Sequence, residues 1–479
     1  MTRLLKYIVP VMFSIGLLAS CEADKITTSP DAKLSFSVDT LRFDTIFTAQ
    51  GSTTKKFKIY NWSKNRVVIS SIALRGEVYK INVDGKKGSY FQDVTINAKD
   101  SLVAYVQLYI NPNDKTLPFI VRDSIVFMTN GNEQKVQLEA YGRNAKRFTN
   151  HTFTADTTIT EAIAVLVKDT LWVPKSVKLT ITDGATLYFC KNAVMMVDGT
   201  LVLQGEQNRF VTLRGDRSDY MNTAPPLCYD DASAQWGGIR FTSNSTGNVF
   251  KFANIRNSSI GIVVDSLNNG SDALKVMSCK ITNSAGNLIA STANKIVLWN
   301  SILCNAGGNI LRINGGELDV KHCTIANYYS YTWGSRKAAN IQLGNMSEYG
   351  TMIPLNAGIY NTIIYGGYNN EVVYNKKEGE EDKCVYGFEN CLIKIVKSNV
   401  DEHYIDCPIN QSPKFVFEDW SDEMKKQNPH KYDFHLQSSS PAIGTAKRSI
   451  SEEPDMRYDL DGNDRTLDGS SDIGCYEYY

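Results

Sequence analysis

The sequence lacks several features that particular functional classes require. Its 479 residues contain 51 Lys and Arg against 51 Asp and Glu, so the chain carries no net charge. Binding to nucleic acid draws affinity from excess positive charge, so we do not expect nucleic acid as a partner. Only five His residues are present, which limits metal sites and acid–base groups. Ten Cys are too few for a disulfide-based scaffold of this length.

The hydrophobic content excludes two further classes. At 42% it is too high for a disordered chain and too low for a protein that crosses a membrane many times. A chain of this length is expected to form two or three domains with sizeable cores.

Residues 1–20 have the pattern of an export signal. Arg3 and Lys6 precede an apolar stretch over residues 7–19, which is shorter than the roughly 20 residues that span a bilayer. The signal ends in Leu18-Ala19-Ser20-Cys21, which resembles a bacterial lipobox. The resemblance implies lipidation of Cys21 and a place in the cell envelope as an outer-membrane lipoprotein, surface-exposed or periplasmic. The alternative is an ordinary cleaved signal. A polar tether, residues 21–33, follows.

Residues 34–145 contain short apolar–polar alternations separated by polar turns. Examples are the runs at 34–38, 56–60 and 104–108 and the turn at 111–114. Strands at this spacing predict a β-sandwich. The stretch LRFDTIFTAQGSTTKKFKIYNWSKNRVVISSI, which begins at Leu41, resembles the Hydin-like immunoglobulin-type family. The resemblance implies a domain that acts as a spacer or binds a partner, and we expect no catalytic residues in it.

Residues 155–430 contain an internal repeat. Six five-residue segments share Ile at their third position, with offsets of 26, 21, 23, 38 and 30 residues. A period near 23 predicts the coils of a parallel β-helix, which stack because one coil cannot bury its own apolar face. We expect these Ile residues to form one interior ladder: Ile255, Ile281, Ile302, Ile325, Ile363 and Ile393. Cys279, Cys323 and Cys391 share another inward position and are interpreted as small core side chains.

Two further segments carry a resemblance to a known superfamily. They are QWGGIRF at 235–241 and the closing stretch with LQSSSPAIG at 436–444 and DLDGNDR at 459–465. With the repeat, they resemble bacterial lipoprotein members of the right-handed parallel β-helix, pectate-lyase-like superfamily. The predicted fold is therefore all-β, an N-terminal β-sandwich followed by a right-handed parallel β-helix. Residues 431–479 are expected to cap its open end.

The resemblance suggests enzymes that act on carbohydrates, but their motifs are largely missing. Of the four motifs of galacturonase-like members, only Asp230-Asp231 is present. No pair of carboxyl groups stands out as the acid and base of a glycosidase. No metal site or cofactor is expected.

Two insertions between coils supply the candidate ligand-binding residues. Aromatic rings stack on the apolar faces of sugars, and charged side chains bond their hydroxyl or carboxylate groups. The candidates are Tyr229, Asp230, Asp231, Trp236, Tyr328, Tyr329, Tyr331, Trp333, Arg336 and Lys337. Packing of these aromatics against the wall of the helix is the alternative. The sequence favours a lipid-anchored envelope protein that binds glycan, with a polysaccharide lyase or glycoside hydrolase, and an adhesin or structural protein, as alternatives.

Overall fold

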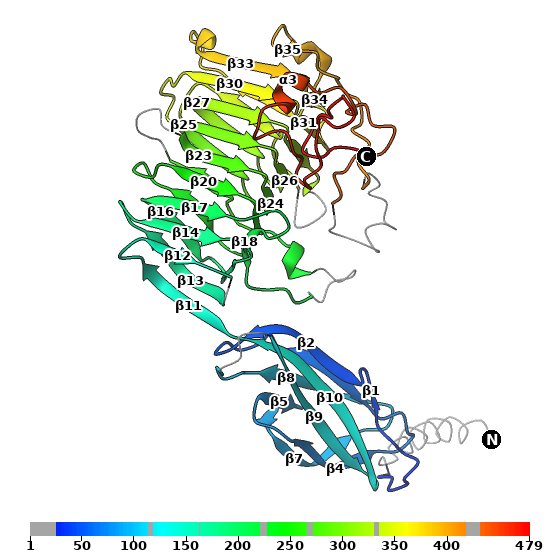
Figure 1. The fold of residues 1–479 in the computed structure, drawn as a ribbon. Helices are drawn as coiled ribbons and strands as arrows, with labels where there is room; N and C mark the ends of the chain where they lie inside the picture. Colours follow the sequence, from blue (N-terminus) through cyan, green and yellow to red (C-terminus); the bar gives the residue numbers. More distant parts are fainter. Residues whose placement is uncertain are drawn as a thin grey trace, which may run out of the picture. The chain divides into compact units, whose positions relative to one another are not determined.

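The computed structural model describes residues 25–113, 118–161, 163–220, 228–265, 272–329, 335–417 and 432–479. The chain divides between Asn144 and Ala145 into two compact units, both built almost entirely of strands (Figure 1). The predicted all-β fold class is confirmed. Cys21, Tyr331 and Trp333 lie outside the described residues. Among the helices in the described ranges, none is long and apolar enough to cross a membrane.

The first unit is a sandwich of two five-stranded sheets. One sheet has the order β1 (Ser35–Phe36), β3 (Lys55–Tyr60), β8 (Ser101–Leu108), β5 (Tyr79–Val83) and β6 (Lys86–Gly88). The other has the order β2 (Thr40–Phe47), β10 (Asn132–Arg143), β9 (Phe119–Thr129), β4 (Val67–Leu74) and β7 (Tyr90–Ile96). Alternate residues of both sheets meet in one core, where the Phe57 and Phe127 rings pack edge to face at 6.4 Å.

The second unit is a parallel β-helix whose 25 strands form one continuous sheet. Its lower strands are β11 (Ala145–Thr152), β12 (Thr157–Ile159), β13 (Ala164–Val173), β14 (Lys178–Thr182), β15 (Thr186–Phe189), β16 (Val194–Val197), β17 (Thr200–Gln204), β18 (Val211–Gly215), β19 (Gly238–Phe241), β20 (Asn248–Lys251), β21 (Ala253–Arg256) and β22 (Ile262–Val264). The upper strands are β23 (Asp272–Met277), β24 (Lys280–Ser284), β25 (Ile289–Trp299), β26 (Ile302–Ala306), β27 (Leu311–Lys321), β28 (Thr324–Asn327), β29 (Ile341–Gly344), β30 (Leu355–Tyr360), β31 (Ile363–Gly366), β32 (Val372–Asn375), β33 (Cys384–Glu389), β34 (Leu392–Ile393) and β35 (Tyr404–Ile405). The described helical elements are η1 (Tyr229–Asp231), η3 (Glu381–Lys383), η4 (Lys397–Asn399) and α3 (Arg448–Ser451).

Each strand of the β-helix pairs with the equivalent strand of the next coil. The face that concerns the site consists of β15, β18, β21, β24, β26, β28, β31 and β34, and is called the β21 face. Along its lower strands, buried and partly exposed residues alternate. The β21 face therefore presents one row of side chains to the core and another to the outside.

The interior ladder of the β21 face differs from the predicted one at two positions. The residues in register are Ile255, Ile281, Leu303, Ile325, Ile364 and Ile393. The prediction is therefore wrong by one residue at Ile302 and Ile363, which pack on the outside of the face against Phe434 and Ile473. Both sides of these strands are apolar because a later segment covers their outer side, so hydrophobicity alone did not identify the interior residue.

The three predicted core cysteines lie in a column of small side chains. The column runs through Ala253, Cys279, Ser301, Cys323, Thr362, Cys391 and Cys407. The backbone N–H of Cys279 donates to Ser301 Oγ at 3.0 Å, and that of Cys323 donates to Thr362 Oγ1 at 3.2 Å. Burial raises the pKa of the Cys279 thiol to about 12. Burial also raises the pKa of the Cys323 and Cys391 thiols, so the three predicted cysteines are neutral hydrogen-bonding core residues.

The described part of the C-terminal segment, residues 432–479, lies along the side of the β-helix. Its apolar residues cover the outer side of β26, β28 and β31. Polar contacts fix it there, because Arg465 Nη2 donates to Asn300 Oδ1 at 2.8 Å and the backbone N–H of Gly474 donates to Asn361 O at 2.9 Å. The segment was predicted to cap the open end, whereas these contacts place it on a side face.

Candidate functional site

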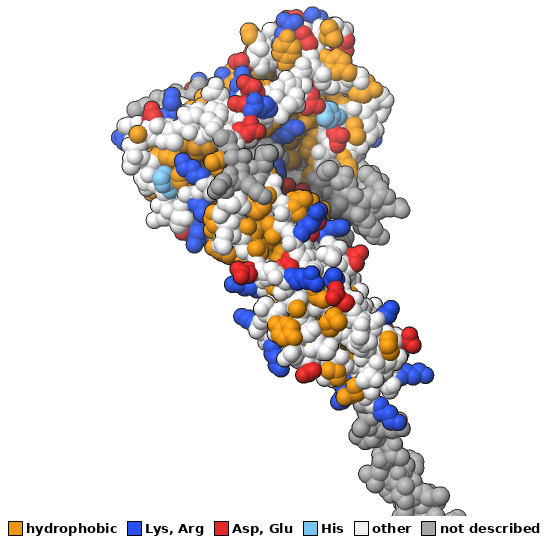
Figure 2. Space-filling view, turned by 60° about the horizontal axis from the view of Figure 1, so that its bottom comes forward, with side chains coloured by type: hydrophobic (Ala, Val, Ile, Leu, Met, Phe, Trp, Pro, Cys, Tyr) orange, Lys and Arg blue, Asp and Glu red, His pale blue; other side chains and the backbone are white. Residues whose placement is uncertain are grey.

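The candidate site is a cleft where the C-terminal segment stops covering the β21 face. Its volume is about 790 Å³, within the range of small-ligand sites. Its floor consists of outward side chains of β21, β24 and β26, one wall is η1, and the other wall comes from residues 416–417 and 432–435 with Tyr476. On the face in Figure 2, apolar side chains and charges of both signs are interspersed over the β-helix, so charge alone marks no site there.

The floor changes from polar to apolar along the helix axis. Asn254, Lys280 and Ile302 occupy successive coils of one outward column, and Arg256, Thr282 and Cys304 occupy the other. The apolar residues begin at β26, where the C-terminal segment starts to cover the face. The cleft thus has a polar end and an apolar end.

Two arginines hold the η1 wall in place. Asp230 accepts hydrogen bonds from Arg256 Nη2 at 2.9 Å and lies 3.0 Å from Arg214 Nη2. The guanidinium of Arg217 covers the ring of Tyr229, with 3.4 Å between its carbon and the ring centroid. The Asp230 carboxylate therefore fixes the turn, and one face of the Tyr229 ring is already occupied.

Two asparagines in the same wall have unsatisfied oxygens. The side-chain amides of Asn257 and Asn283 donate to the backbone carbonyls of Asp230 and Asp231. Their Oδ1 atoms are buried and have no hydrogen-bond partner in the described structure, although both residues line the cleft. Leaving such an acceptor unpaired costs about 1–3 kcal/mol. A donor that enters the cleft, from water or from a ligand, would remove that cost.

The opposite wall contains a histidine between two carboxylates. His435 Nδ1 lies 2.5 Å from Asp433 Oδ1, its Nε2 lies 2.8 Å from Asp461 Oδ2, and its ring stacks on Tyr476 at 3.8 Å. Burial lowers the pKa of His435, but the hydrogen bonds and charges of Asp433 and Asp461 outweigh it, so the pKa is raised. With both nitrogens facing acceptors, the imidazolium form is favoured.

This arrangement predicts a pH dependence for the wall. The folded-state pKa of His435 is raised above its usual value of 6.5, so its stabilising contribution is complete below about pH 6.5 and is lost as pH rises through the folded-state pKa. We expect the difference in Tm between the parent protein and His435→Gln to shrink between pH 6 and pH 9, measured by thermal unfolding. A difference independent of pH would contradict the assigned charge state.

The structure brings only part of the predicted site together. Asp230 and Asp231 line the cleft, and Tyr328 lies beside it, with its ring parallel to that of Tyr432 at 6.4 Å. Lys337 is exposed, and its backbone N–H donates to Gly307 O at 2.8 Å.

Three predicted binding residues have structural roles instead. Trp236 is fully buried, stacks on Phe189 at 4.2 Å and donates its ring N–H to Arg256 O at 2.8 Å. Tyr329 is buried and its hydroxyl is 2.9 Å from Ser233 Oγ. Arg336 is buried against Glu371. The prediction that they contact a ligand is corrected, since burial against the helix makes their side chains inaccessible.

Sequence reasoning missed the C-terminal wall of the cleft. Asp433 and His435 are separated by one residue, a spacing that places two polar side chains on the same side of an extended segment. That spacing was the available signal. It was overlooked because the segment was interpreted only as a cap.

Comparisons with known proteins identify no family. No family model matches the chain, and no curated protein matches it. A family 28 exopolygalacturonase from Yersinia enterocolitica gives a TM-score of 0.21 at 9% identity, over 70% of this chain and 89% of that chain. A protein of unknown function from Porphyromonas gingivalis gives 0.18 at 10% identity, over 26% of this chain and 50% of that chain. A PapD-like domain of human CEP192 gives 0.17 at 8% identity, over 26% of this chain and 94% of that chain.

These likenesses are too weak to identify function. The chain spans about half the length of the Porphyromonas gingivalis protein, and all three TM-scores are far below 0.5. The fold itself is clear: a β-sandwich is followed by a parallel β-helix that has a cleft on one side face.

Proposed function

We propose that the protein binds a glycan in the cleft of the β21 face. The observation that carries this proposal is the polar floor of the cleft, where Asn254, Lys280 and Thr282 lie at partly exposed, outward positions of β21 and β24. The amide, ammonium and hydroxyl groups of these side chains can form hydrogen bonds with sugar hydroxyls. Aromatic side chains line the other wall, namely Phe417, Tyr432, Phe434 and Tyr476. Rings and amides together suit the two kinds of surface on a sugar, its C–H faces and its hydroxyls.

Binding is favoured over hydrolysis because two of the ionisable groups in the cleft, Asp230 and His435, are engaged in fixing its walls. Asp230 is paired with two arginines, and His435 has a carboxylate at each ring nitrogen. A general acid or base must be able to exchange its proton with the substrate. The alternatives remain a polysaccharide lyase or hydrolase, and an adhesin or scaffold without a glycan ligand.

The proposal is tested by blocking the cleft without removing a core residue. Thr282 is outward-facing on the floor, so Thr282→Trp places a large ring inside the cleft. We expect glycan-array signals of the full-length protein to fall at least tenfold. The matched control is Tyr349→Trp, at a position that is 95% exposed and away from the cleft, and it should leave binding unchanged.

Other outcomes discriminate between the alternatives. If neither the parent nor the control protein binds any glycan, the scaffold alternative is favoured and the proposal fails. If the parent releases unsaturated or reducing ends from a polysaccharide panel, the protein is an enzyme, and loss of that activity in Thr282→Trp would place it in the cleft.

We also propose that the protein is exported and anchored in the bacterial outer membrane through lipid on Cys21. The support comes from the sequence of residues 1–21. Several acyl chains on one residue anchor stably, whereas a single chain binds only marginally. A lipid-anchored protein that binds glycan would hold the glycan at the cell envelope in which the protein is anchored.

A further inference from the structure

The two sheets of the sandwich differ sharply in charge. In the sheet β1-β3-β8-β5-β6, strand β3 has three Lys, β5 has one and β6 has two, which makes six, and these five strands contain no Asp or Glu. The other sheet carries both signs, and its Arg122 pairs with Glu139 across strands at 2.9 Å. If the lysines served only solubility, we would expect them to be spread over both sheets. Their concentration without acidic residues gives the first sheet an electropositive character that the other sheet lacks.

Strand register gathers four of these lysines on the outer side of the sheet, which is called the lysine face. Lys56 pairs with Tyr105, Tyr105 with Asn82, and Asn82 with Lys87, so one row crosses four strands. Lys58 lies two residues along β3, and Lys80 is opposite Gln107 in the next row. All four lysines are exposed, and none has an ion pair among the described residues.

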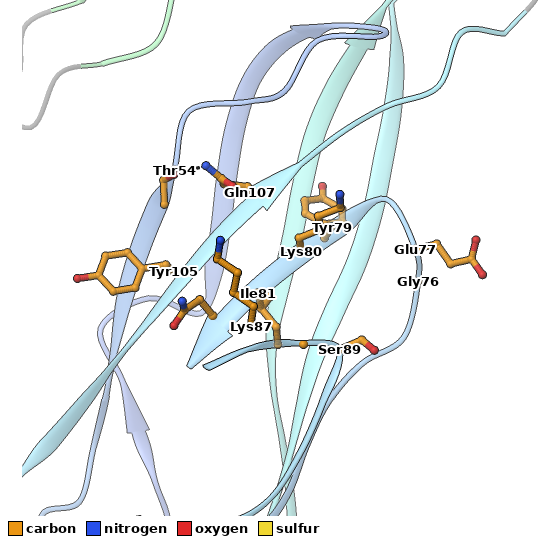
Figure 3. Close-up of a pocket in the computed structure, with 12 residues that line it drawn as sticks. Thr54, Gly76, Glu77, Tyr79, Lys80, Ile81, Lys87, Ser89, Tyr105 and Gln107 are labelled. Atoms are coloured by element: carbon orange, nitrogen blue, oxygen red, sulfur yellow. Dashed lines mark hydrogen bonds between the residues drawn. The ribbon is translucent and has the colours of Figure 1, made fainter. Parts of the chain in front are cut away.

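The lysine face is hollowed and has an aromatic ring among the charges. A cavity of about 940 Å³ is lined by Lys80, Lys87, Asn82, Gln107 and Tyr105 among others, and Glu77 is the one carboxylate among the described residues of its lining. Figure 3 shows Tyr105, Gln107, Lys80 and Lys87 around this hollow on neighbouring strands. Tyr105 is 43% exposed, although it lies in the middle of the sheet. A stacked pair of aromatic rings, Tyr60 and Trp62 at 5.0 Å, follows Lys58 along the chain.

We propose that the lysine face binds an anionic polysaccharide. Strands about 4.8 Å apart, with outward residues about 6.8 Å apart along each strand, present several ammonium groups to one extended chain. Counterions bound to an anionic polymer are released when its carboxylate or sulfate groups pair with ammonium groups. Because one polymer pairs with several lysines at once, this release favours a polymer over a single anion. The exposed ring of Tyr105 offers a stacking surface for a sugar unit, which a lipid headgroup does not need. This site lies on a different unit from the cleft and does not depend on the cleft's function.

The test uses the full-length protein with dextran sulfate, and with unmodified dextran of equal length as the neutral probe. We expect the parent to bind dextran sulfate but not dextran, with affinity that falls as salt rises. Combined replacement of Lys56, Lys58, Lys80 and Lys87 by Gln should weaken binding at least tenfold and flatten its salt dependence. Tyr105→Ala should weaken binding without changing the salt dependence, because it removes a stacking surface and no charge.

A matched variant separates local recognition from net charge. Replacing Lys168, Lys175, Lys178 and Lys191 by Gln removes the same charge from exposed positions of the β-helix. This variant should bind dextran sulfate as the parent does. Equal loss in both quadruple variants would overturn the proposal, as would parent binding to anionic lipid vesicles but not to dextran sulfate. Thr282→Trp should leave binding to dextran sulfate intact, so failure of the cleft proposal is distinguishable from failure of this one.

Discussion

Replacing Glu371 by alanine should lower the free energy of unfolding of the β-helix by about 3–5 kcal/mol. Both side chains of its ion pair with Arg336 are buried, at 0% and 2% exposure. Glu371 also accepts hydrogen bonds from the backbone N–H groups of Tyr368 at 3.0 Å and Asn340 at 3.2 Å. Its removal leaves a guanidinium in the interior with no carboxylate beside it. Denaturant unfolding followed by circular dichroism measures the loss.

Two controls isolate the cause of that loss. Glu348 pairs with Arg312 at 3.0 Å, but their side chains are 61% and 32% exposed, so Glu348→Ala should cost less than about 1 kcal/mol. Replacing both members of the buried pair, Arg336→Met with Glu371→Leu, should restore most of the stability because no charge remains buried. Equal effects of Glu371→Ala and Glu348→Ala would show that the Arg336 site admits water.

Replacing Cys21 by alanine should transfer the protein almost completely from the membrane fraction to the soluble fraction of its host. The proposed anchor depends on acyl chains carried by this residue, and each buried methylene contributes about 0.8 kcal/mol to membrane affinity. Fractionation of cells that express the full-length chain, followed by immunodetection, measures the distribution. Metabolic labelling with a fatty-acid analogue should mark the parent but not Cys21→Ala.

The matched control for the anchor is another cysteine that is not deeply buried. Cys228 is a partly buried free thiol beside the cleft wall, and Cys228→Ala should leave both distribution and labelling unchanged. Persistent membrane association of Cys21→Ala would show that another part of the protein holds it there.

The repeat in the sequence was sufficient to predict a parallel β-helix, but not the register of every coil. In β21 and β24, one side of the strand is polar, so Ile255 and Ile281 were unambiguous interior residues. In β26 every residue is buried, and the adjacent Ile302 and Leu303 are equally suited to either side. Only the tertiary contact with the C-terminal segment decides between them, and that contact joins residues far apart in sequence.

The candidate site was harder to predict for a related reason. Aromatic residues in an insertion are suited both to stacking on a ligand and to burial in the core. The residues around Trp236 and Tyr329 in the sequence do not distinguish these outcomes. The structure buries both. Asp230 lines the cleft, but its arginine partners come from β18 and β21, which precede and follow it in the chain. The wall that contains His435 joins the cleft only through folding of the C-terminal segment.

The position of the C-terminal segment, residues 432–479, has a consequence for the order in which the protein folds. Arg465 bonds to Asn300 across a sequence separation of 165 residues. Contacts of such separation form late, because the whole intervening chain must be available first. Until the C-terminal segment docks, the apolar outer side of β26 and β31 is exposed, and exposed apolar strand surface promotes aggregation. The cleft wall formed by residues 432–435 and Tyr476 is therefore complete only after both the coils of the β-helix and the C-terminal segment have folded.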